Sequence, residues 1–376
     1  MKGSIIKVGI KTLGEPDILY TEKGVLVKNL LIGDGFHWQQ TIEALLPGQV
    51  YRVEAAEEEK SEADSNVTLI NELPLETYLE CVVGSEMNPE APMEFLKAHA
   101  VISRSWALGK IEKSHSHDDD GRVVSEEKLI GWDDTAGHHG FDVCSDDHCQ
   151  RFQGLQEIDI KALEAIRGTA GEILRSPSGN LVDARFYKCC GGRTELFSTC
   201  WQDREEDCLE SFEDPWCDLS GLTEKEREKV LRSILKAYDL ITEDYGYRWE
   251  TKISKAEIRK NLKERFGRDI GDICRLEPIH RGASGRIDLL KIYGTEGTLE
   301  LGKELWIRRL LSPTHLYSSA FKIEASGETL QLKGKGWGHG VGLCQIGAAN
   351  MALHGHNYEE ILQFYYPGSV LTRSGR

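Results

Sequence analysis

Short alternating runs of apolar and polar residues fill the first fifty positions of the chain. Residues 4–53 contain segments such as IIKVGIK and GVLVKNLLIG, separated by residues that favour turns. A period of two is typical of a strand with one buried face, so this part predicts a small β-rich segment. The acidic stretch AAEEEKSEADSN at 55–66 then predicts an exposed connection.

A helical period replaces this alternation after residue 74. The pattern predicts a helix over 75–86 and a second helix that begins at Pro92, because proline suits the first helical position. The apolar face of the first helix comprises Leu79, Val82, Val83 and Met87. One side of the second helix comprises Phe95, His99, Ile102 and Trp106.

The second half of the chain mixes helical and strand patterns. Residues 222–266 are amphipathic and predict helix, whereas GRIDLLKIYGTEGTLELG at 285–302 predicts a hairpin. A helix after Gln345 is expected to end at Gly355, and Asn357 with Glu360 predicts a capping box for the next helix. The fold class is therefore α+β, with a mixed, β-rich core, a helical segment and a helical insertion in one elaborated unit.

Composition limits the classes of molecule that this protein is expected to bind. The chain has 376 residues, 40% of them hydrophobic, and a net charge of -16. Phosphate backbones need basic patches, so nucleic acids and anionic membranes fit poorly, and a neutral polymer or a small molecule fits better. The N-terminus MKGSIIKVGIKTLGEPD has lysines within its apolar part and predicts a strand, not a signal peptide or a membrane span. Either the chain stays inside the cell, or an export segment lies outside this sequence.

Ten cysteines are many for a cytosolic enzyme. The chain is too large to need disulfides, so a metal site in at least one cluster is the sharper interpretation. Cys189 and Cys190 are neighbours on a predicted strand and point to opposite faces, which argues against one metal held by both. Disulfides remain open among Cys189, Cys190, Cys200, Cys208 and Cys217.

The stretch HHGFDVCSDDHC at 138–149 is the best metal candidate. His138, Cys144, His148 and Cys149 form a two-Cys, two-His set suited to tetrahedral zinc. Four protein ligands leave no open position, so we expect a structural zinc and no organic cofactor. The alternatives are a solvated loop with reduced cysteines and a Cys144–Cys149 bridge.

The stretch KGKGWGHGVGLCQIGAANMALHG at 333–355 has five glycines at alternate positions, from Gly334 to Gly342. It fits neither the dinucleotide fingerprint nor a phosphate loop. Glycines allow close approach to the backbone, so Trp337, His339 and Gln345 could present their side chains to a ligand. The alternative is a Gly-rich turn packed against a neighbouring strand.

Five blocks in this order carry a family resemblance: LPLETYLECVVGSEM, KAHAVISRSWAL, FYKCCGGRTE, GWGHGVGLCQIGAANMALHG and YEEILQFYYPGSVL. They resemble the SpoIID family, sporulation-associated lytic transglycosylases of bacterial peptidoglycan with relatives described as amidase enhancers. The resemblance runs from about residue 67 to the end and implies a catalytic domain at 67–376. The hydrophobic patterns add an N-terminal β-rich segment at 1–66 and a helical subdomain at 220–275. The family's spacing also favours His138 over His139 as the first metal ligand.

The resemblance implies cleavage of the MurNAc–GlcNAc bond without water, because the muramic acid O6 attacks C1 and leaves a 1,6-anhydro end. It places the catalytic carboxyl at Glu86, acting first as acid and then as base. The last turn of a helix faces the negative end of the helix dipole, which raises the pKa of a carboxyl there and suits a general acid. The alternative is a surface glutamate at a helix end.

The resemblance also implies substrate-binding residues. Arg104 is expected to pair with Glu86 or to orient substrate, with a helix-surface arginine as the alternative. Tyr187 and Lys188 are expected to hydrogen-bond sugar groups, although Tyr187 also suits a strand core. Tyr365 and Tyr366 are expected to divide between the substrate groove and the core.

Three functions follow from these features. The leading interpretation is a lytic transglycosylase that acts on peptidoglycan glycan strands, intact or stripped of peptides, in the cell envelope outside the cytoplasm. A zinc amidase would need an open metal position, which two Cys and two His in one loop do not leave. The third is a non-catalytic, glycan-binding enhancer with a cell-wall amidase as partner, in which Glu86 is dispensable.

Overall fold

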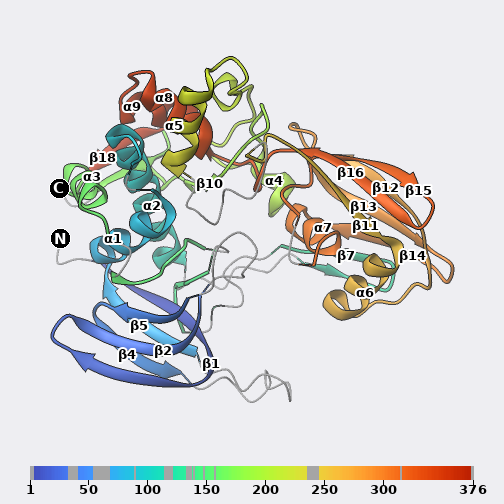
Figure 1. Cartoon of the computed structure of the whole chain (residues 1–376), viewed down its shortest axis with the longest axis horizontal. Coiled ribbons are helices and arrows are strands. Elements are labelled where there is room, and N and C mark those ends of the chain that lie inside the picture. The colour runs from blue at the N-terminus through green and yellow to red at the C-terminus, as the bar shows by residue number, and fades with distance from the viewer. Residues whose placement is uncertain are drawn as a thin grey trace.

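The computed structural model describes residues 4–32, 41–53, 68–88, 90–113, 122–132, 138, 140–146, 149–155, 158–234, 245–313 and 316–373. Its helices and strands form two lobes, each with its own hydrophobic core (Figure 1). The second lobe comprises residues 122–132 and 245–335, except that Trp132 and Tyr245 pack in the core of the first lobe, which holds the other described residues. The mixture of helices and strands confirms the predicted α+β class.

The N-terminal half of the first lobe is a sheet with the order β3-β2-β1-β5-β4, which confirms the predicted β-rich segment. A short sixth strand, β8 (Val143–Cys144), pairs in parallel with β1. The boundary expected at residue 66 falls between β4 and β5, which pair with each other. The other strands are β1 (Ile5–Thr21), β2 (Gly24–Ile32), β3 (Thr41–Leu46), β4 (Gln49–Val53) and β5 (Thr68–Pro74).

Two consecutive helices follow this sheet and lie beside it in Figure 1. They are α1 (Leu75–Glu86) and α2 (Met93–Lys113), close to the predicted ranges. All eight apolar-face residues named for them in the sequence are buried. Because side chains at i, i+3 and i+4 share one face of a helix, this burial confirms the two predicted faces.

The remaining elements of the first lobe come from later in the chain. Strand β10 pairs in parallel with β17, although their sequences lie far apart. The capping box predicted for α9 is present at Asn357 and Glu360. These elements are α3 (Ile160–Gly168), β9 (Glu172–Arg175), β10 (Phe186–Tyr187), α4 (Phe197–Cys200), the 3-10 helix η4 (Pro215–Cys217), α5 (Glu224–Ile234), β17 (Leu343–Cys344), α8 (Gln345–Leu353), α9 (Tyr358–Tyr365) and β18 (Val370–Arg373).

The second lobe contains a sheet of order β11-β16-β15 and a sheet of order β12-β13-β14-β7-β6. The predicted hairpin is confirmed as β13 and β14. The range 222–266, predicted to be helical, instead contains a strand, β11, between α5 and α6. The elements are β6 (Val123–Val124), β7 (Lys128–Ile130), β11 (Arg248–Ser254), α6 (Lys255–Phe266), β12 (Ile273–Arg281), β13 (Ile287–Gly294), β14 (Thr298–Gly302), α7 (Glu304–Leu310), β15 (Phe321–Ser326) and β16 (Thr329–Lys335).

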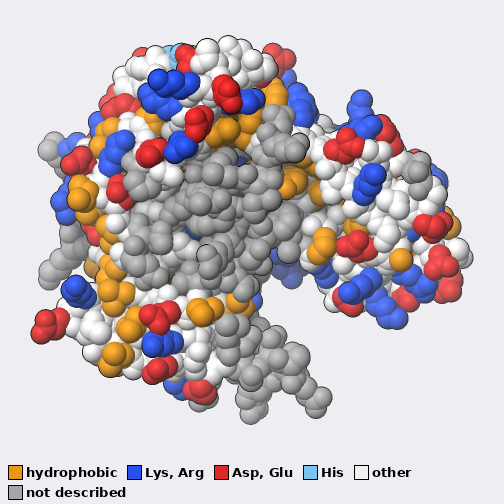
Figure 2. Space-filling model, viewed as in Figure 1, with side chains coloured by type: hydrophobic (Ala, Val, Ile, Leu, Met, Phe, Trp, Pro, Cys, Tyr) orange, Lys and Arg blue, Asp and Glu red, His pale blue; other side chains and the backbone are white. Residues whose placement is uncertain are grey.

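The chain enters and leaves the 245–335 part of the second lobe on paired strands, because Arg248 of β11 lies opposite Lys335 of β16. Figure 2 shows acidic and basic side chains intermingled over the second lobe, as on a solvated surface. None of the described helices is both long enough and apolar enough to cross a membrane.

Candidate functional site

Glu86 is the last residue of α1, as predicted, and only 7% of its surface is exposed. Its Oε1 accepts a hydrogen bond from the backbone N–H of Arg151 at 2.9 Å. Next to it, the Ser85 hydroxyl accepts one from the N–H of Gln153 at 3.2 Å. Two backbone amides of the segment 150–153 therefore hold the end of α1.

The segment 150–153 is itself packed against α1. The ring of Phe152 stacks on that of Tyr78, with centroids 5.7 Å apart. The Tyr78 hydroxyl donates to Gln150 Oε1 at 3.3 Å. These contacts fix the position of the amide that binds Glu86.

Three of the four predicted metal ligands lie directly before this segment. The ligand atoms of His138, Cys144 and Cys149 are all within 4.8 Å of one another. His138 Nε2 lies 3.9 Å from Cys149 Sγ, and its Nδ1 lies 3.3 Å from the carbonyl oxygen of Asp142. A ligating histidine commonly uses its second ring nitrogen in this way, so these residues fit a metal. His148 and the alternative His139 lie outside the described residues.

Arg104 does not pair with Glu86, and it is not a helix-surface residue. Its side chain is 1% exposed, and its Nε and Nη2 donate to the carboxylate of Glu76 at 2.7 and 2.9 Å. Its Nη1 donates to the carbonyl of Glu172 at 3.1 Å. Arg104 therefore links α1 and α2 to β9, and it reaches Glu86 only through α1.

The Gly-rich stretch wraps around a buried arginine that the sequence did not single out. Nε and Nη2 of Arg286 donate to the carbonyl of Gly338 at 3.1 and 3.0 Å. A Cβ on Gly340 would lie 2.6 Å from the Arg286 guanidinium carbon, and one on Gly338 would lie 2.7 Å from Cβ of Tyr187. Both glycines have positive φ, at 88° and 98°. Close packing therefore explains these glycines, as the alternative interpretation expected.

His339 is half-buried in this stretch and lies between two aromatic rings. The centroid of Trp201 is 4.9 Å away and that of Tyr187 is 5.3 Å away. Burial and the nearby Arg185 and Arg286 guanidinium groups hold the pKa of His339 well below its usual value. Its Nδ1 accepts the N–H of Val341 at 3.1 Å, which leaves the proton of the neutral ring on Nε2. His339 can therefore donate a hydrogen bond to an oxygen atom, and the Phe186 backbone is one acceptor beside it.

The other predicted sugar-binding residues of the Gly-rich stretch point inward. Trp337 is buried, and its ring contacts that of Tyr317. Gln345 is 1% exposed, and its Nε2 lies 3.3 Å from Nε2 of the buried His99. Both residues serve the interior of the first lobe in this structure.

The tyrosines also differ from expectation. Tyr365 and Tyr366 are both buried, so the expected division between groove and core is wrong. Their hydroxyls donate to Asp214 Oδ2 at 3.0 Å and to the carbonyl of Arg185 at 2.6 Å. Tyr187 is buried as well, which matches the strand-core alternative.

Lys188 lies closer to the end of α1. Its Nζ donates to the carbonyl of Ile234 at 3.1 Å, and the N–H of Asn88 donates to the neighbouring carbonyl of Ser233 at 3.4 Å. The C-terminal end of α5 therefore connects Lys188 with the residues that follow Glu86.

Several buried polar residues of the site were not predicted. The carboxylate of Glu195 accepts the N–H groups of Ala283 and Ser284 at 2.9 and 3.0 Å, which ties the lobes together. The guanidinium of Arg185 lies 3.6 Å from the centroid of a Trp201 ring. A second group of ligand-type side chains comprises Cys190, Asp214, Cys217 and Cys344. Such residues have no periodicity. Glu195 and Cys190 lie in the highlighted block FYKCCGGRTE and Cys344 lies in the Gly-rich block, but nothing in these blocks indicated their partners.

Two family models match the chain. Residues 63–175 match SpoIID, described as Stage II sporulation protein. Residues 195–342 match a domain of unknown function, DUF8618. The first range contains Glu86 and the His138–Cys149 loop, and the second ends at Gly342, the last of the five alternating glycines.

Known proteins are similar over most of this chain. An uncharacterised protein of Brachyspira hyodysenteriae is 27% identical over 305 residues, which are 81% of this chain and 68% of that protein. The Stage II sporulation protein D of Bacillus amyloliquefaciens is 26% identical over 308 residues, 81% of this chain and 76% of that protein. The amidase enhancer of Bacillus subtilis is 24% identical over 317 residues, 78% of this chain and 40% of that protein. Residues 63–175 therefore form a SpoIID domain, and most of the chain is similar to proteins named Stage II sporulation protein D and amidase enhancer.

Proposed function

We propose that this chain is a lytic transglycosylase that cleaves the MurNAc–GlcNAc bond of peptidoglycan glycan strands, with Glu86 as its acid and base. The observation that carries the proposal is the setting of this carboxyl group inside the range matched to SpoIID. Arg151 holds Oε1, whereas Oε2 accepts no hydrogen bond from the described residues. One oxygen is thus oriented and the other remains for the substrate.

The proposed reaction needs this one carboxyl group. Protonated Glu86 donates its proton to the glycosidic oxygen as the bond from that oxygen to C1 of MurNAc breaks. The resulting carboxylate then accepts the proton of the muramic acid O6 as O6 bonds to C1, which closes the 1,6-anhydro ring. A glycosidase that uses water needs a second carboxyl group beside the bond.

Other residues of the site have supporting roles in this proposal. Arg104 is a positioning residue, because it fixes α1 through Glu76. His339 is a candidate donor to a sugar oxygen through Nε2–H. Lys188 is a candidate contact near the end of α1, because α5 connects it with Asn88.

The loop before Arg151 is proposed to hold a structural zinc through His138, Cys144, His148 and Cys149. Such a set is closed and tetrahedral, so the metal would supply folding energy and not a bound nucleophile. Cys149 stands two residues before Arg151. The zinc would therefore steady the amide that orients Glu86.

The substrate implies a location outside the cytoplasm, in the cell envelope. The experiment is mass spectrometry of purified peptidoglycan, intact and stripped of peptides, after incubation with the chain. We expect 1,6-anhydroMurNAc ends from the wild type. Glu86→Gln should form them roughly 10²- to 10⁴-fold more slowly, the usual contribution of a general acid and base.

Glu80→Gln is the matched control, because Glu80 lies on the same helix and is only half-buried. This variant should keep the wild-type rate. A folded wild type that yields no anhydro ends on either substrate would sink the proposal.

A second candidate function rests on the similarity to the amidase enhancer of Bacillus subtilis. In that case the chain binds glycan and stimulates a cell-wall amidase, without cleaving sugars itself. Release of peptides by an amidase, with and without the chain, separates the two functions. Stimulation that survives Glu86→Gln, with no anhydro ends from any form, would favour the enhancer.

A further inference from the structure

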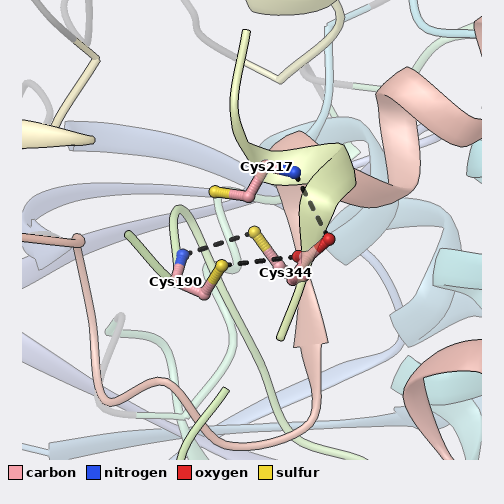
Figure 3. Close-up of side chains that lie close together, drawn as sticks. Cys190, Cys217 and Cys344 are labelled. Atoms are coloured by element: carbon pink, nitrogen blue, oxygen red, sulfur yellow. Dashed lines mark hydrogen bonds between the residues drawn. The ribbon is translucent and has the colours of Figure 1, made fainter. Parts of the chain in front are cut away.

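Four buried side chains from three distant segments meet next to the Gly-rich stretch. Cys190 follows β10, Asp214 and Cys217 belong to η4 and its N-cap, and Cys344 ends β17. Their ligand atoms all lie within 4.8 Å of one another. Figure 3 shows the sulfur atoms of the three cysteines facing one another across a common space. This group is separate from the His138 loop.

We propose that Cys190, Asp214, Cys217 and Cys344 form a second metal site, a closed tetrahedral centre for a thiophilic divalent ion such as Zn²⁺. Tetrahedral zinc with Zn–S of about 2.3 Å and Zn–O of about 2.0–2.2 Å keeps a sulfur and an oxygen ligand about 3.5 Å apart. The observed separation of Cys190 Sγ and Asp214 Oδ2 is 3.4 Å. The side chains therefore stand close to the required spacing.

Backbone N–H groups around the four side chains would stabilise cysteine thiolates. The N–H of Gly192 donates to Cys190 Sγ at 3.2 Å, and the N–H of Cys190 donates to Cys344 Sγ at 3.3 Å. Donors of this kind offset the negative charge of metal-bound sulfur and orient the ligands. If these four buried side chains ionise, a cation among them is needed, because uncompensated charges in the interior are costly.

Asp214 is the fourth ligand on geometric grounds. Its Oδ1 already accepts the N–H groups of Trp216 and Cys217 at 3.0 and 3.3 Å, which fixes the carboxylate. Its Oδ2 faces Cys190, and the Tyr365 hydroxyl donates to it at 3.0 Å. When Cys190 loses its proton to bind the ion, Oδ2 gives up the hydrogen bond from that thiol and gains the metal.

Cys189 offers a competing arrangement. Its Sγ lies 3.5 Å from Cys217 Sγ, although the two cysteines form no disulfide in this structure. It stands outside the group of four, in line with the expectation that it and Cys190 do not bind one metal together. A disulfide between Cys189 and Cys217 would remove one ligand, so the experiment must distinguish it from metal.

The experiment uses the whole chain with Cys144→Ser and Cys149→Ser, which disables the His138 loop. This variant is loaded with Zn²⁺ in a reducing agent, freed of excess metal and checked for folding by circular dichroism. We expect elemental analysis to find a single zinc ion per chain. Zinc absorption-edge spectroscopy should find about three sulfur neighbours at about 2.3 Å and one lighter neighbour at about 2.0–2.2 Å.

Two further variants locate this zinc. Adding Cys190→Ser and Cys344→Ser should abolish it, whereas adding Cys208→Ser and Cys274→Ser removes as many thiols elsewhere and should leave it. If the variant with Cys190→Ser and Cys344→Ser does not fold, the zinc-edge spectrum of the Cys144→Ser, Cys149→Ser variant still tests the proposal through the number of sulfur neighbours. A folded loop variant without zinc, a shell dominated by nitrogen and oxygen, or a Cys189–Cys217 disulfide in zinc-free, reductant-treated protein would overturn the proposal.

Discussion

At the scale of single residues, the site depends on buried polar side chains that hold backbone segments in place. Arg104, Arg286 and Glu195 are all nearly inaccessible, and each binds a segment distant in the sequence. None of these roles could be predicted from the sequence, because a buried ion has no characteristic spacing. Glu86 could be proposed as the acid and base only because it stands at the end of a strongly patterned helix within a recognisable block.

Replacement of Arg104 tests its role as a link. Arg104→Ala leaves Glu76 and the carbonyl of Glu172 without their donor, so we expect it to lower the free energy of unfolding by about 3 kcal/mol. Urea denaturation measures the change. Arg232→Ala is the matched control, because its pair with Glu228 is exposed on α5 and should cost less than about 0.5 kcal/mol. Equal losses in the two variants would contradict the buried link.

Two glycines with similar positive φ allow the cost of backbone strain to be measured separately from the cost of side-chain crowding. Gly340 and Gly355 have φ of 88° and 91°, but only at Gly340 would a Cβ meet the Arg286 guanidinium. Gly355→Ala should cost about 1–2 kcal/mol for the left-handed backbone alone. Gly340→Ala should cost about 1–3 kcal/mol more, because the methyl group must displace a packed side chain. Thermal unfolding compares them, and similar losses would mean that Arg286 moves aside freely.

At the scale of elements, the sequence predicted the structure best where one hydrophobic period continued over the whole helix or strand. The helix at 75–86, the hairpin at 285–302 and the capping box of α9 follow from local patterns, and all are confirmed. Strand β11 was missed because it lies between two charged helices, whose period was extended across it. The strand has an alternating face in Trp249, Thr251 and Ile253, so the information was present but local.

Helix α2 carries a histidine that should make stability depend on pH. Burial, assisted by the charge of Lys188, lowers the pKa of His99 from 6.5 to about 3. The unfolded chain therefore takes up a proton below pH 6.5 that the folded chain refuses, so this contribution to stability is complete above pH 6.5 and is lost as the pH falls towards 3. The slope should be about 1.4 kcal/mol per pH unit, or about 2 kcal/mol between pH 6.5 and 5.

His99→Gln isolates that contribution, because glutamine does not titrate. Urea unfolding at pH 7.5 and at pH 5 should show a smaller loss of stability for the variant than for the wild type, by about 2 kcal/mol. An identical loss in both proteins would show that His99 is protonated equally in the folded and unfolded chains.

At the scale of the whole molecule, long-range pairing decides what meets at the site. Strand β7 pairs in parallel with β14, and β10 pairs in parallel with β17, across more than a hundred residues in each case. The cysteines at 190, 217 and 344 meet for the same reason. Nothing local in the sequence specifies such partners, so only the His138–Cys149 loop, with all its candidate ligands in one short stretch, could be predicted as a metal site.

The two lobes should loosen when their buried carboxylate is neutralised. Glu195 accepts the N–H groups of Ala283 and Ser284 from the β12–β13 turn, and Glu195→Gln exchanges one accepting oxygen for a donor. We expect hydrogen exchange at these two amides to become at least about tenfold faster, equivalent to about 1.4 kcal/mol. Glu213→Gln, at an 87% exposed side chain, should leave both amides protected. Unchanged exchange in Glu195→Gln would show that the turn is held by other contacts.

The pairing of Arg248 with Lys335 has a consequence for how this architecture can be inherited. Opposite residues on antiparallel strands are about 5 Å apart, so a tight turn could replace everything between them. The larger part of the second lobe is thus a removable module. Its loss would leave the segments before Arg248 and after Lys335 close enough to be joined. Removing this module would leave residues 123–130 behind, and β7 would then lack β14 as its partner. A chimera that swaps this module must therefore carry both pieces, or supply a new edge for the strand left behind.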